Sequence, residues 1–400
     1  MNKTKDPINH AAFRLSAVCL ILIVFTPIGV HPAYTAALDR YVAKTGSNSG
    51  NCSFNPCLTV AYAISQSGSD DILHIAAGTY TENLVPNHNL YFLGAGMHAT
   101  ILDGGSVGTV ITGGSYNLFF QDLTIRHGHT PDGGGGIAQS GGALILNRVL
   151  VTGNVAAYGG GIISSGPFTM TDSVVSDNTA NAGSGGGLFL QGSALSEDLI
   201  NVTISGNTAT SYSGGLHDQA AGSTLNLTNA TISGNTAKLN GAMTVTNTAT
   251  ANILNTTIAG NHFSTDGANG GIGNYATVYF KNSLLTGNDA RNCGNGTGGL
   301  MITLGHNLES GNTCSFSLTS DLPNTDPQLG PLADNGGPTQ THALLDGNIL
   351  HPRSPAIDAG TDTGCPSTDQ RGVARPQGAH CDIGAFELMI ARIYMPLVRR

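Results

Sequence analysis

The sequence contains no tryptophan, and charged residues occupy only 10% of its 400 positions, which is less than half of the usual share. Its 16 Lys and Arg residues form no basic cluster and the net charge is −9, so a nucleic-acid-binding surface is excluded. Long hydrophobic runs are also scarce. The one extended run, Leu15–Val30, is interrupted by Pro27 and Gly29 and is short for a membrane-spanning helix.

That run has the features of an export signal. Lys3, Lys5 and Arg14 precede it, and small residues follow it at Ala36 and Ala37. The sequence therefore predicts a signal peptide over residues 1–37 and a secreted or cell-surface protein whose mature chain has no transmembrane segment. A transmembrane anchor is the alternative interpretation of the same run.

Glycine is abundant, at 56 residues, and much of it belongs to a repeated phrase that ends in asparagine. Typical copies are Ile204-Ser-Gly-Asn207 and Ile232-Ser-Gly-Asn235, and a glycine block lies between most copies. The final asparagines are Asn154, Asn178, Asn207, Asn235, Asn261 and Asn288. Spacings of 24 to 29 residues are typical of a solenoid.

Positions counted back from each final asparagine predict which side chains face inward. The residues three and eight positions earlier are always apolar, as Ile204 and Leu199 are, which predicts two core columns of stacked strands. The residue four positions earlier should face outward, as Thr203, Thr231 and Thr257 do. Six positions earlier, an amide ladder is predicted at Asn201, Asn229, Asn255 and Asn282.

The final asparagines themselves are interpreted as turn residues, because Gly and Asn enter left-handed backbone conformations at the lowest cost. The sequence thus predicts an all-β fold, a parallel β-helix. Leucine-rich repeats share the period, but they require leucine five positions before the asparagine, where this chain has Ser173, Ala230 and Thr256. Their helical return segment also conflicts with the Gly, Ser and Thr found here.

The region before the repeats contains a short amphipathic segment, Leu58–Ile64, followed by short strands such as Ile72–Ala76. It resembles the N-terminal part of pectate-lyase-like right-handed β-helices, in which a short helix covers the open end of the coils. The resemblance implies a right-handed parallel β-helix with an N-terminal cap and first coils over 38–110. Regular coils are then expected over 111–321.

After Gly296 the period is lost, and ordered motifs follow, among them Asp334–Ala343, Ser354–Gly360 and Cys381–Glu387. They resemble the C-terminal module of bacterial surface proteins called choice-of-anchor Q domains. We therefore expect such a module, irregular and capping, over 322–388, followed by a short tail over 389–400. The tail is too short and too charged to span a bilayer.

Six cysteines remain after removal of the signal, an even number that indicates disulfides in an exported chain. Because a solenoid brings together residues that are near in sequence, the predicted pairs are Cys52–Cys57, Cys293–Cys314 and Cys365–Cys381. Metal binding is the alternative, although no Cys-x-x-Cys motif or His cluster accompanies these cysteines.

An active site is harder to find in the repeats, because glycoside hydrolysis needs two carboxyl groups at a fixed separation and acids do not recur in one register. His217 and Asp218 form the one adjacent acid–base pair in the repeats, but a strand would aim neighbouring side chains in different directions. In the C-terminal module, calcium ligands are conceivable at Asp358, Asp362, Asp369 and Asp382. Capping of turns and pairing with arginine is the favoured explanation of these carboxylates.

Three functions agree with the sequence. The first is a binding or structural module that presents an elongated polar face to polysaccharide or cell-surface glycan. The second is a carbohydrate-active enzyme, a polysaccharide lyase or hydrolase, with catalytic groups from loops such as Leu216–Ser223 or Asp266–Asn274. The third is an adhesin that associates through its stacked Thr and Asn faces. The scattered acids favour the first hypothesis over the enzyme.

Overall fold

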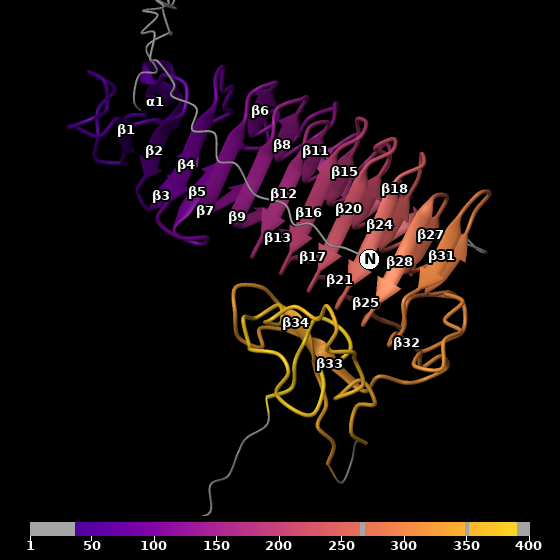
Figure 1. The fold of residues 1–400 in the computed structure, drawn as a ribbon. Helices are drawn as coiled ribbons and strands as arrows, with labels where there is room; N and C mark the ends of the chain where they lie inside the picture. Colours follow the sequence, from indigo (N-terminus) through magenta and orange to yellow (C-terminus); the bar gives the residue numbers. More distant parts are fainter. Residues whose placement is uncertain (1–36, 265–268, 349–351, 390–400) are drawn as a thin grey trace, which may run out of the picture. The chain divides into compact units, whose positions relative to one another are not determined.

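The computed structural model describes residues 37–264, 269–348 and 352–389, and these described residues belong to one compact unit. The predicted signal peptide and most of the predicted tail lie outside the described residues, as does Asp266. The described chain winds into a right-handed parallel β-helix of stacked coils, as the sequence predicts (Figure 1). Each coil contributes strands to several parallel ladders that run along the stack.

The first ladder joins strands with an alternating buried and exposed pattern. Its members, in order along the stack, are β1 (Asp39–Val42), β2 (Asp71–Ile75), β4 (Leu90–Gly94), β7 (Leu118–Arg126), β9 (Leu144–Thr152), β12 (Phe168–Thr171), β16 (Ser196–Ile200), β20 (Thr224–Thr228), β24 (Thr250–Leu254), β28 (Thr277–Lys281) and β31 (Leu300–Thr303). One of the two predicted core columns, which includes Met170 and Leu199, lies on this ladder and is buried.

The second ladder follows the first around each coil and carries the other predicted core column. Its members are β3 (Gly78–Thr81), β5 (Thr100–Asp103), the second halves of β7 and β9, β13 (Val174–Ser176), β17 (Thr203–Ser205), β21 (Thr231–Ser233), β25 (Thr257–Ala259), β29 (Leu284–Thr286) and β32 (Leu308–Glu309). Val175, Ile204 and Ile232 pair in register and are buried, so the predicted inward direction of this column is confirmed.

The remaining ladders close the coil. The third comprises β6 (Ile111–Gly114), β8 (Ile137–Gln139), β11 (Ile162–Ser164), β15 (Leu188–Leu190), β19 (Leu216–Asp218), β23 (Met243–Val245), β27 (Ile272–Asn274) and β30 (Cys293–Asn295). A short ladder of β10 (Val155–Ala156), β14 (Thr179–Ala180), β18 (Thr208–Tyr212), β22 (Thr236–Leu239) and β26 (His262–Phe263) precedes β11, β15, β19, β23 and β27 of the third ladder. The glycine blocks lead from this short ladder into the third.

A single short helix, α1 (Val60–Gln66), packs against β1 and β2 at the beginning of the stack. It starts two residues later than predicted because Thr59 is its N-cap, whose hydroxyl accepts the Tyr62 N–H at 3.2 Å. The Glu82 carboxylate accepts the N–H groups of Val60 and Ala61 at 3.0 and 2.8 Å. A carboxylate at this end satisfies N–H groups that the helix itself cannot pair.

The structure partly reverses the turn and ladder roles that the sequence predicted for the two asparagine columns. The left-handed residue at each repeated Gly-Asn corner is the glycine, with φ +65° at Gly206, and the asparagine after it turns inward. Asn207 is fully buried, and its Nδ2 donates to Asn235 Oδ1 at 2.9 Å. The same side-chain bond runs without interruption through Asn154, Asn178, Asn207, Asn235, Asn261 and Asn288.

The column predicted as the ladder instead occupies the left-handed corner between the first and second ladders, with φ +56° at Asn201 and +44° at Asn255. Its amides bond to one another in part: Asn229 Nδ2 donates to Asn201 Oδ1 at 3.2 Å, whereas Asn255 Nδ2 donates to the Asp382 carbonyl. Both columns therefore combine a turn role with amide pairing, and sequence spacing alone could not separate them.

The C-terminal residues form a loop-rich module on the outer side of the second ladder. The module contains one antiparallel pair, β33 (Leu329–Ala333) and β34 (Thr341–Leu344). Its apolar residues Ile357, Ile383 and Phe386 pack with Leu284 and Leu308 of the solenoid. The three predicted disulfides, Cys52–Cys57, Cys293–Cys314 and Cys365–Cys381, are all present.

The module corrects the prediction that the Thr203, Thr231 and Thr257 column is an open outer face. Thr231 Oγ1 donates to Gln370 Oε1 at 2.6 Å, Thr203 Oγ1 donates to the Gln340 carbonyl at 2.6 Å, and Thr257 Oγ1 accepts the Ala385 N–H at 3.0 Å. All three threonines are buried. The face proposed above as a self-association surface is thus occupied by the chain itself, which contradicts that form of the adhesin hypothesis.

Candidate functional site

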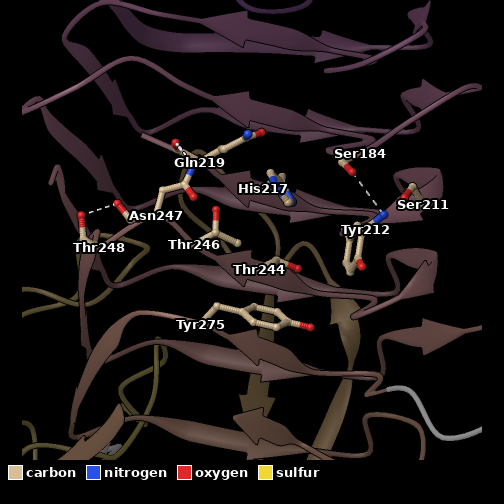
Figure 2. Close-up of a pocket in the computed structure, with 10 residues that line it drawn as sticks. All are labelled: Ser184, Ser211, Tyr212, His217, Gln219, Thr244, Thr246, Asn247, Thr248 and Tyr275. Carbon is tan, nitrogen blue, oxygen red and sulfur yellow. Dashed lines mark hydrogen bonds between the residues drawn. The ribbon is translucent and has the colours of Figure 1, made fainter. Parts of the chain in front are cut away.

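A groove of about 660 Å³ lies on the outer side of the third ladder, where β19 and β23 meet the loops that follow them (Figure 2). Its lining is polar and aromatic: Ser184, Ser211, Tyr212, His217, Gln219, Thr244, Thr246, Asn247, Thr248 and Tyr275. None of these residues is Asp, Glu, Lys or Arg. The groove is therefore built for hydrogen bonding and stacking rather than for ion pairing.

The middle residues of the three-residue strands form the floor of the groove, because in a strand bordered by inward-facing residues the middle side chain faces out. Phe189, His217 and Thr244 pair in register on β15, β19 and β23. The next position is Gly273. A Cβ there would lie 2.0 Å from the Asn240 amide, so glycine leaves the room that Asn240 occupies.

The polar side chains at the base of the groove are held by one another. Asn240 Nδ2 donates to Thr244 Oγ1 at 3.1 Å, and Ser213 and Thr244 are joined through their hydroxyls at 2.6 Å. Asn269 Nδ2 donates to Asn240 Oδ1 at 2.9 Å. Because Ser213, Asn240 and Thr244 are buried and paired, this part of the base keeps one arrangement without a ligand.

Aromatic rings pack against one another at the groove, and His217, Tyr212 and Tyr275 are the rings that line it. The His217 ring stacks on Phe189 with centroids 5.1 Å apart and an interplanar angle of 6°, and the Tyr212 ring is 6.2 Å from His217. Tyr158 packs edge-on against Phe189 at 5.9 Å. Tyr275, which remains 41% exposed, follows β27 and lies beyond Thr244 from His217 (Figure 2).

His217 is held neutral by its surroundings. Burial lowers the pKa of its imidazole to about 4, since an apolar environment disfavours the charged ring. Its Nδ1 is buried and has no hydrogen-bond partner. At neutral pH the ring therefore carries no charge and presents a stacking surface together with hydrogen-bonding nitrogen atoms.

Asp218, the other member of the candidate catalytic pair, does not face the groove. It is fully buried in the interior of the solenoid, where Oδ1 accepts the Ala220 N–H at 2.9 Å. Adjacent residues on β19 therefore point to opposite sides of the wall, as strand alternation requires. The structure separates His217 from Asp218, and the pair cannot act together as acid and base on one ligand.

A second interior acid, Glu197 on β16, was not singled out from the sequence. Burial and the nearby Asp218 charge raise the pKa of Glu197 to about 8, and burial raises the pKa of Asp218 to about 7. The sequence pattern could have shown that both acids face inward. Glu197 lies two residues before the core residue Leu199, and Asp218 lies two residues after the core residue Leu216. Side chains two apart on a strand share a face.

The four carboxylates considered for calcium are engaged by N–H groups of the module. Asp369 bonds Arg371 at 2.6 Å, Asp382 accepts the Asp358 N–H at 2.7 Å, and Asp358 accepts the Ala379 N–H at 2.7 Å. Asp362 accepts the Cys381 N–H at 2.9 Å. Within the described residues no group of three or more His, Cys, Asp or Glu side chains could hold a metal.

Of the loops suggested for an enzyme, Leu216–Ser223 contributes His217 and Gln219 to the groove, whereas Asp266 lies outside the described residues. The groove lining offers neither the carboxyl pair that glycosidases use nor a strong base. In the part of the chain that the structure describes, no helix is long and apolar enough to cross a membrane.

These features define a pectate-lyase-like right-handed parallel β-helix. The crystal structure of pectate lyase Pel9A matches it with a TM-score of 0.53 and 14% identity, over 88% of this chain and 97% of that one. A pectin methylesterase from carrot aligns over 71% of this chain and 87% of its own at 13% identity, with a TM-score of only 0.33. The match to pectate lyase Pel9A shows a shared fold, and at 14% identity the activity does not follow from it.

Comparison at the level of sequence adds no relative. No family model matches the chain, and no curated protein matches it. The resemblance of residues 322–388 to choice-of-anchor Q domains therefore stays a prediction.

Proposed function

We propose that this protein binds carbohydrate, and specifically neutral polysaccharide, in the groove formed by β19, β23 and their loops. The observation that carries the proposal is the combination of aromatic rings with an uncharged lining of hydroxyl and amide groups. Sugar rings offer apolar C–H faces to aromatic side chains and hydroxyls to polar ones. A groove without Lys or Arg gives no compensation for the charge of an acidic polymer.

The proposal places binding ahead of catalysis. Lyases and hydrolases need acid or base groups positioned at the reacting bond. His217 is the one groove residue that could serve near neutral pH, and its candidate partner Asp218 faces the interior. A single neutral imidazole supports ligand orientation better than bond cleavage.

The proposed setting is extracellular. Three disulfides agree with an oxidising compartment. Together with the signal peptide expected over residues 1–37, they support export. We further propose that residues 322–388 act as a surface-protein module that closes one side of the solenoid. The natural partner of the protein is then a cell-surface glycan.

Titration calorimetry of the chain from Ala37 onward tests the proposal, with neutral polymers such as xylan and β-glucan against acidic polygalacturonate. We expect saturable binding to at least one neutral polymer, weakened about tenfold by Tyr275→Ala, the usual effect of one lost aromatic contact. Tyr91→Ala is the matched control, since Tyr91 is equally exposed at 41% on a distant coil.

Binding of only the acidic polymer, or of no polymer, would refute the proposal. Release of reducing ends or unsaturated sugar during the same incubation would show that the chain is an enzyme instead. The circular dichroism of each variant confirms that the strands are intact, so that a loss of binding is not a loss of fold.

A further inference from the structure

The first ladder ends at β31, which pairs with β28 on one side and with no described strand on the other (Figure 1). The second and third ladders are covered where they end. Leu322 bridges to β32, and the Cys293 N–H of β30 donates to Thr313 Oγ1 at 3.1 Å beside the disulfide to Cys314. Within the described residues, the last coil therefore leaves an open strand edge on β31.

The hydrogen bonds of β31 show which of its backbone groups are free. The N–H groups of Leu300 and Leu304 donate to carbonyls of the preceding coil at 2.7 and 2.8 Å. Backbone groups point alternately to the two sides of a strand, so those of Met301 and Thr303 point away from β28. No described residue donates to these carbonyls or accepts from these N–H groups. Met301 and Thr303 can thus each pair with another strand.

The open edge lacks the usual protection against association. Strand edges are normally protected by charged side chains, proline or a bulge. Residues 293–305 contain no charged residue and no proline. Apolar side chains surround the edge instead: Leu300 and Leu304 are each 52% exposed, and Leu318, which is 47% exposed, approaches the turn at Gly305. Such an edge is typical of a surface that another chain covers.

The charge of this end favours a second copy of the same chain as the partner. The protein has a net charge of −9, so two copies repel each other in general. In residues 293–320, however, the only Asp, Glu, Lys or Arg is Glu309. It is buried and accepts the N–H groups of Thr313 and Cys314 at 2.8 and 2.9 Å. Identical charges would meet across a two-fold axis, and this segment exposes none.

The opposite end of the solenoid is closed to β31. The Tyr41 N–H of β1 donates to the Cys52 carbonyl at 2.8 Å, and the Cys57 N–H donates to the Tyr41 carbonyl at 2.8 Å. The loop between these two cysteines therefore occupies the outer edge of β1, and α1 packs against the same strand. A head-to-tail chain of copies through β31 and β1 is excluded, which leaves pairing between two identical ends.

We propose that two copies of this chain associate through β31, with the two β31 strands antiparallel about a two-fold axis. In the register centred on Ile302, Met301 and the partner's Thr303 exchange their N–H and C=O groups, and the symmetric pair does the same. Leu300 then lies opposite the partner's Leu304, which buries the exposed leucines. The contact is closed, so association ends at a dimer. It uses none of the residues that line the groove.

Sedimentation of the whole mature chain over a range of concentrations tests the dimer. We expect an equilibrium between monomer and dimer in the wild type. Leu300→Lys combined with Leu304→Lys places lysine opposite lysine, so we expect the dissociation constant to rise at least about a hundredfold. Leu300→Lys combined with Leu304→Glu removes the same leucines but places lysine opposite glutamate. Its dissociation constant should stay within about tenfold of the wild-type value.

Val107→Lys, at an exposed position on an early coil, is the control and should leave the equilibrium unchanged. A wild type that stays monomeric at millimolar concentration would overturn the proposal. Equal weakening in the two double variants would contradict it as well, because the register brings together like charges in one variant and opposite charges in the other. Growth beyond a dimer would refute the closed pairing.

A measurement on the unaltered protein covers the case in which the double variants do not fold. Hydrogen exchange of the Met301 and Thr303 amides should slow as the protein concentration rises, because these N–H groups are bonded only in the dimer. The Tyr41 amide, which is bonded within each copy, is the internal control and should exchange at the same rate throughout. Exchange at Met301 and Thr303 that is independent of concentration would overturn the proposal.

Discussion

The outer side of the second ladder and the outer side of the third ladder both carry small hydroxyl residues, yet only one of them is open. Thr203, Thr231 and Thr257 on the second ladder are buried beneath the C-terminal module. Thr246 and Thr248, which follow β23, line an open groove. Strand alternation therefore determines that a side chain leaves the coil interior, but not whether solvent or another part of the chain meets it.

The chemistry of the two surfaces differs in a way that explains this. On the covered surface each threonine has a defined partner in the module, and the column continues into Leu284 and Leu308, which join the module's apolar cluster. In the groove His217 is buried, whereas Tyr275 remains 41% exposed. A continuous apolar end favours permanent docking, whereas a partly exposed aromatic wall is typical of a ligand site.

The largest expected effect is loss of the contact that holds the module on the solenoid. Gln370 Nε2 donates to the Val202 carbonyl at 3.1 Å and to Thr203 Oγ1 at 2.9 Å, and Oε1 accepts from Thr231. Gln370→Ala should destabilise the docked module by about 4 kcal/mol, because several buried polar groups lose their partner together.

Hydrogen exchange of residues 322–388 measures this effect. Gln377→Ala, which removes only an exposed bond to the Ala374 carbonyl, is the control and should change little. Unchanged protection in Gln370→Ala would mean that the apolar cluster alone keeps the second ladder covered.

The next effect concerns acid stability at the groove. Because the folded-state pKa of His217 is lowered to about 4, the folded protein binds fewer protons than the unfolded chain above that pH. Stability from this group is complete above the ordinary histidine pKa and declines as pH falls to about 4, by about 3 kcal/mol at most.

His217→Phe keeps an aromatic ring on Phe189 and should remove this part of the acid sensitivity in unfolding experiments between pH 7 and pH 4. His129→Phe, at an exposed site outside the groove, is the control and should leave the wild-type profile unchanged. A His217→Phe profile identical to that of the wild type would show that the ring is protonated in the folded state without penalty.

A smaller effect is expected from one hydroxyl of the covered column. Thr231→Val preserves shape and strand preference but deletes the bond to Gln370, so we expect a loss of about 1.5 kcal/mol in the free energy of unfolding. Thr228→Val, on the first ladder where the side chain is half-buried, should be nearly neutral. If the two variants are equally stable, coverage by the module contributes nothing through this hydroxyl.

The smallest effect on stability is expected on the open surface. Tyr275→Ala removes a side chain that is 41% exposed and makes no side-chain hydrogen bond with the other groove residues drawn in Figure 2, so stability should change by less than about 0.5 kcal/mol. Thermal unfolding of this variant checks the point. A larger loss would mean that Tyr275 is part of the packing, and the contrast with the covered surface would weaken.

Much of the architecture could be predicted because a solenoid repeats its local rules. Leu199 and Ile204 occur at fixed distances from Asn207, and each later coil repeats them, so periodicity alone gave the core columns and the coil stacking. The disulfide pairs followed from the same property. The roles of the two asparagine columns were partly exchanged, because left-handed conformation and amide pairing favour the same residue type.

The candidate site was only partly predictable. His217 could be named from the sequence, but its environment depends on Phe189 and Thr244, which become its neighbours only when coils stack. Asp218 was paired with His217 because the two are adjacent in sequence, whereas its side chain lies in the interior of the solenoid. That inward position could have been read from strand alternation.

By itself the sequence determined the class of fold, the direction of the repeated side chains and the pairing of its cysteines, because each depends on residues within about one coil of each other. Only the tertiary structure decided which outer surface is closed. The contacts that close it join Thr203 to Gln340 across 137 residues, and no local rule reaches that far.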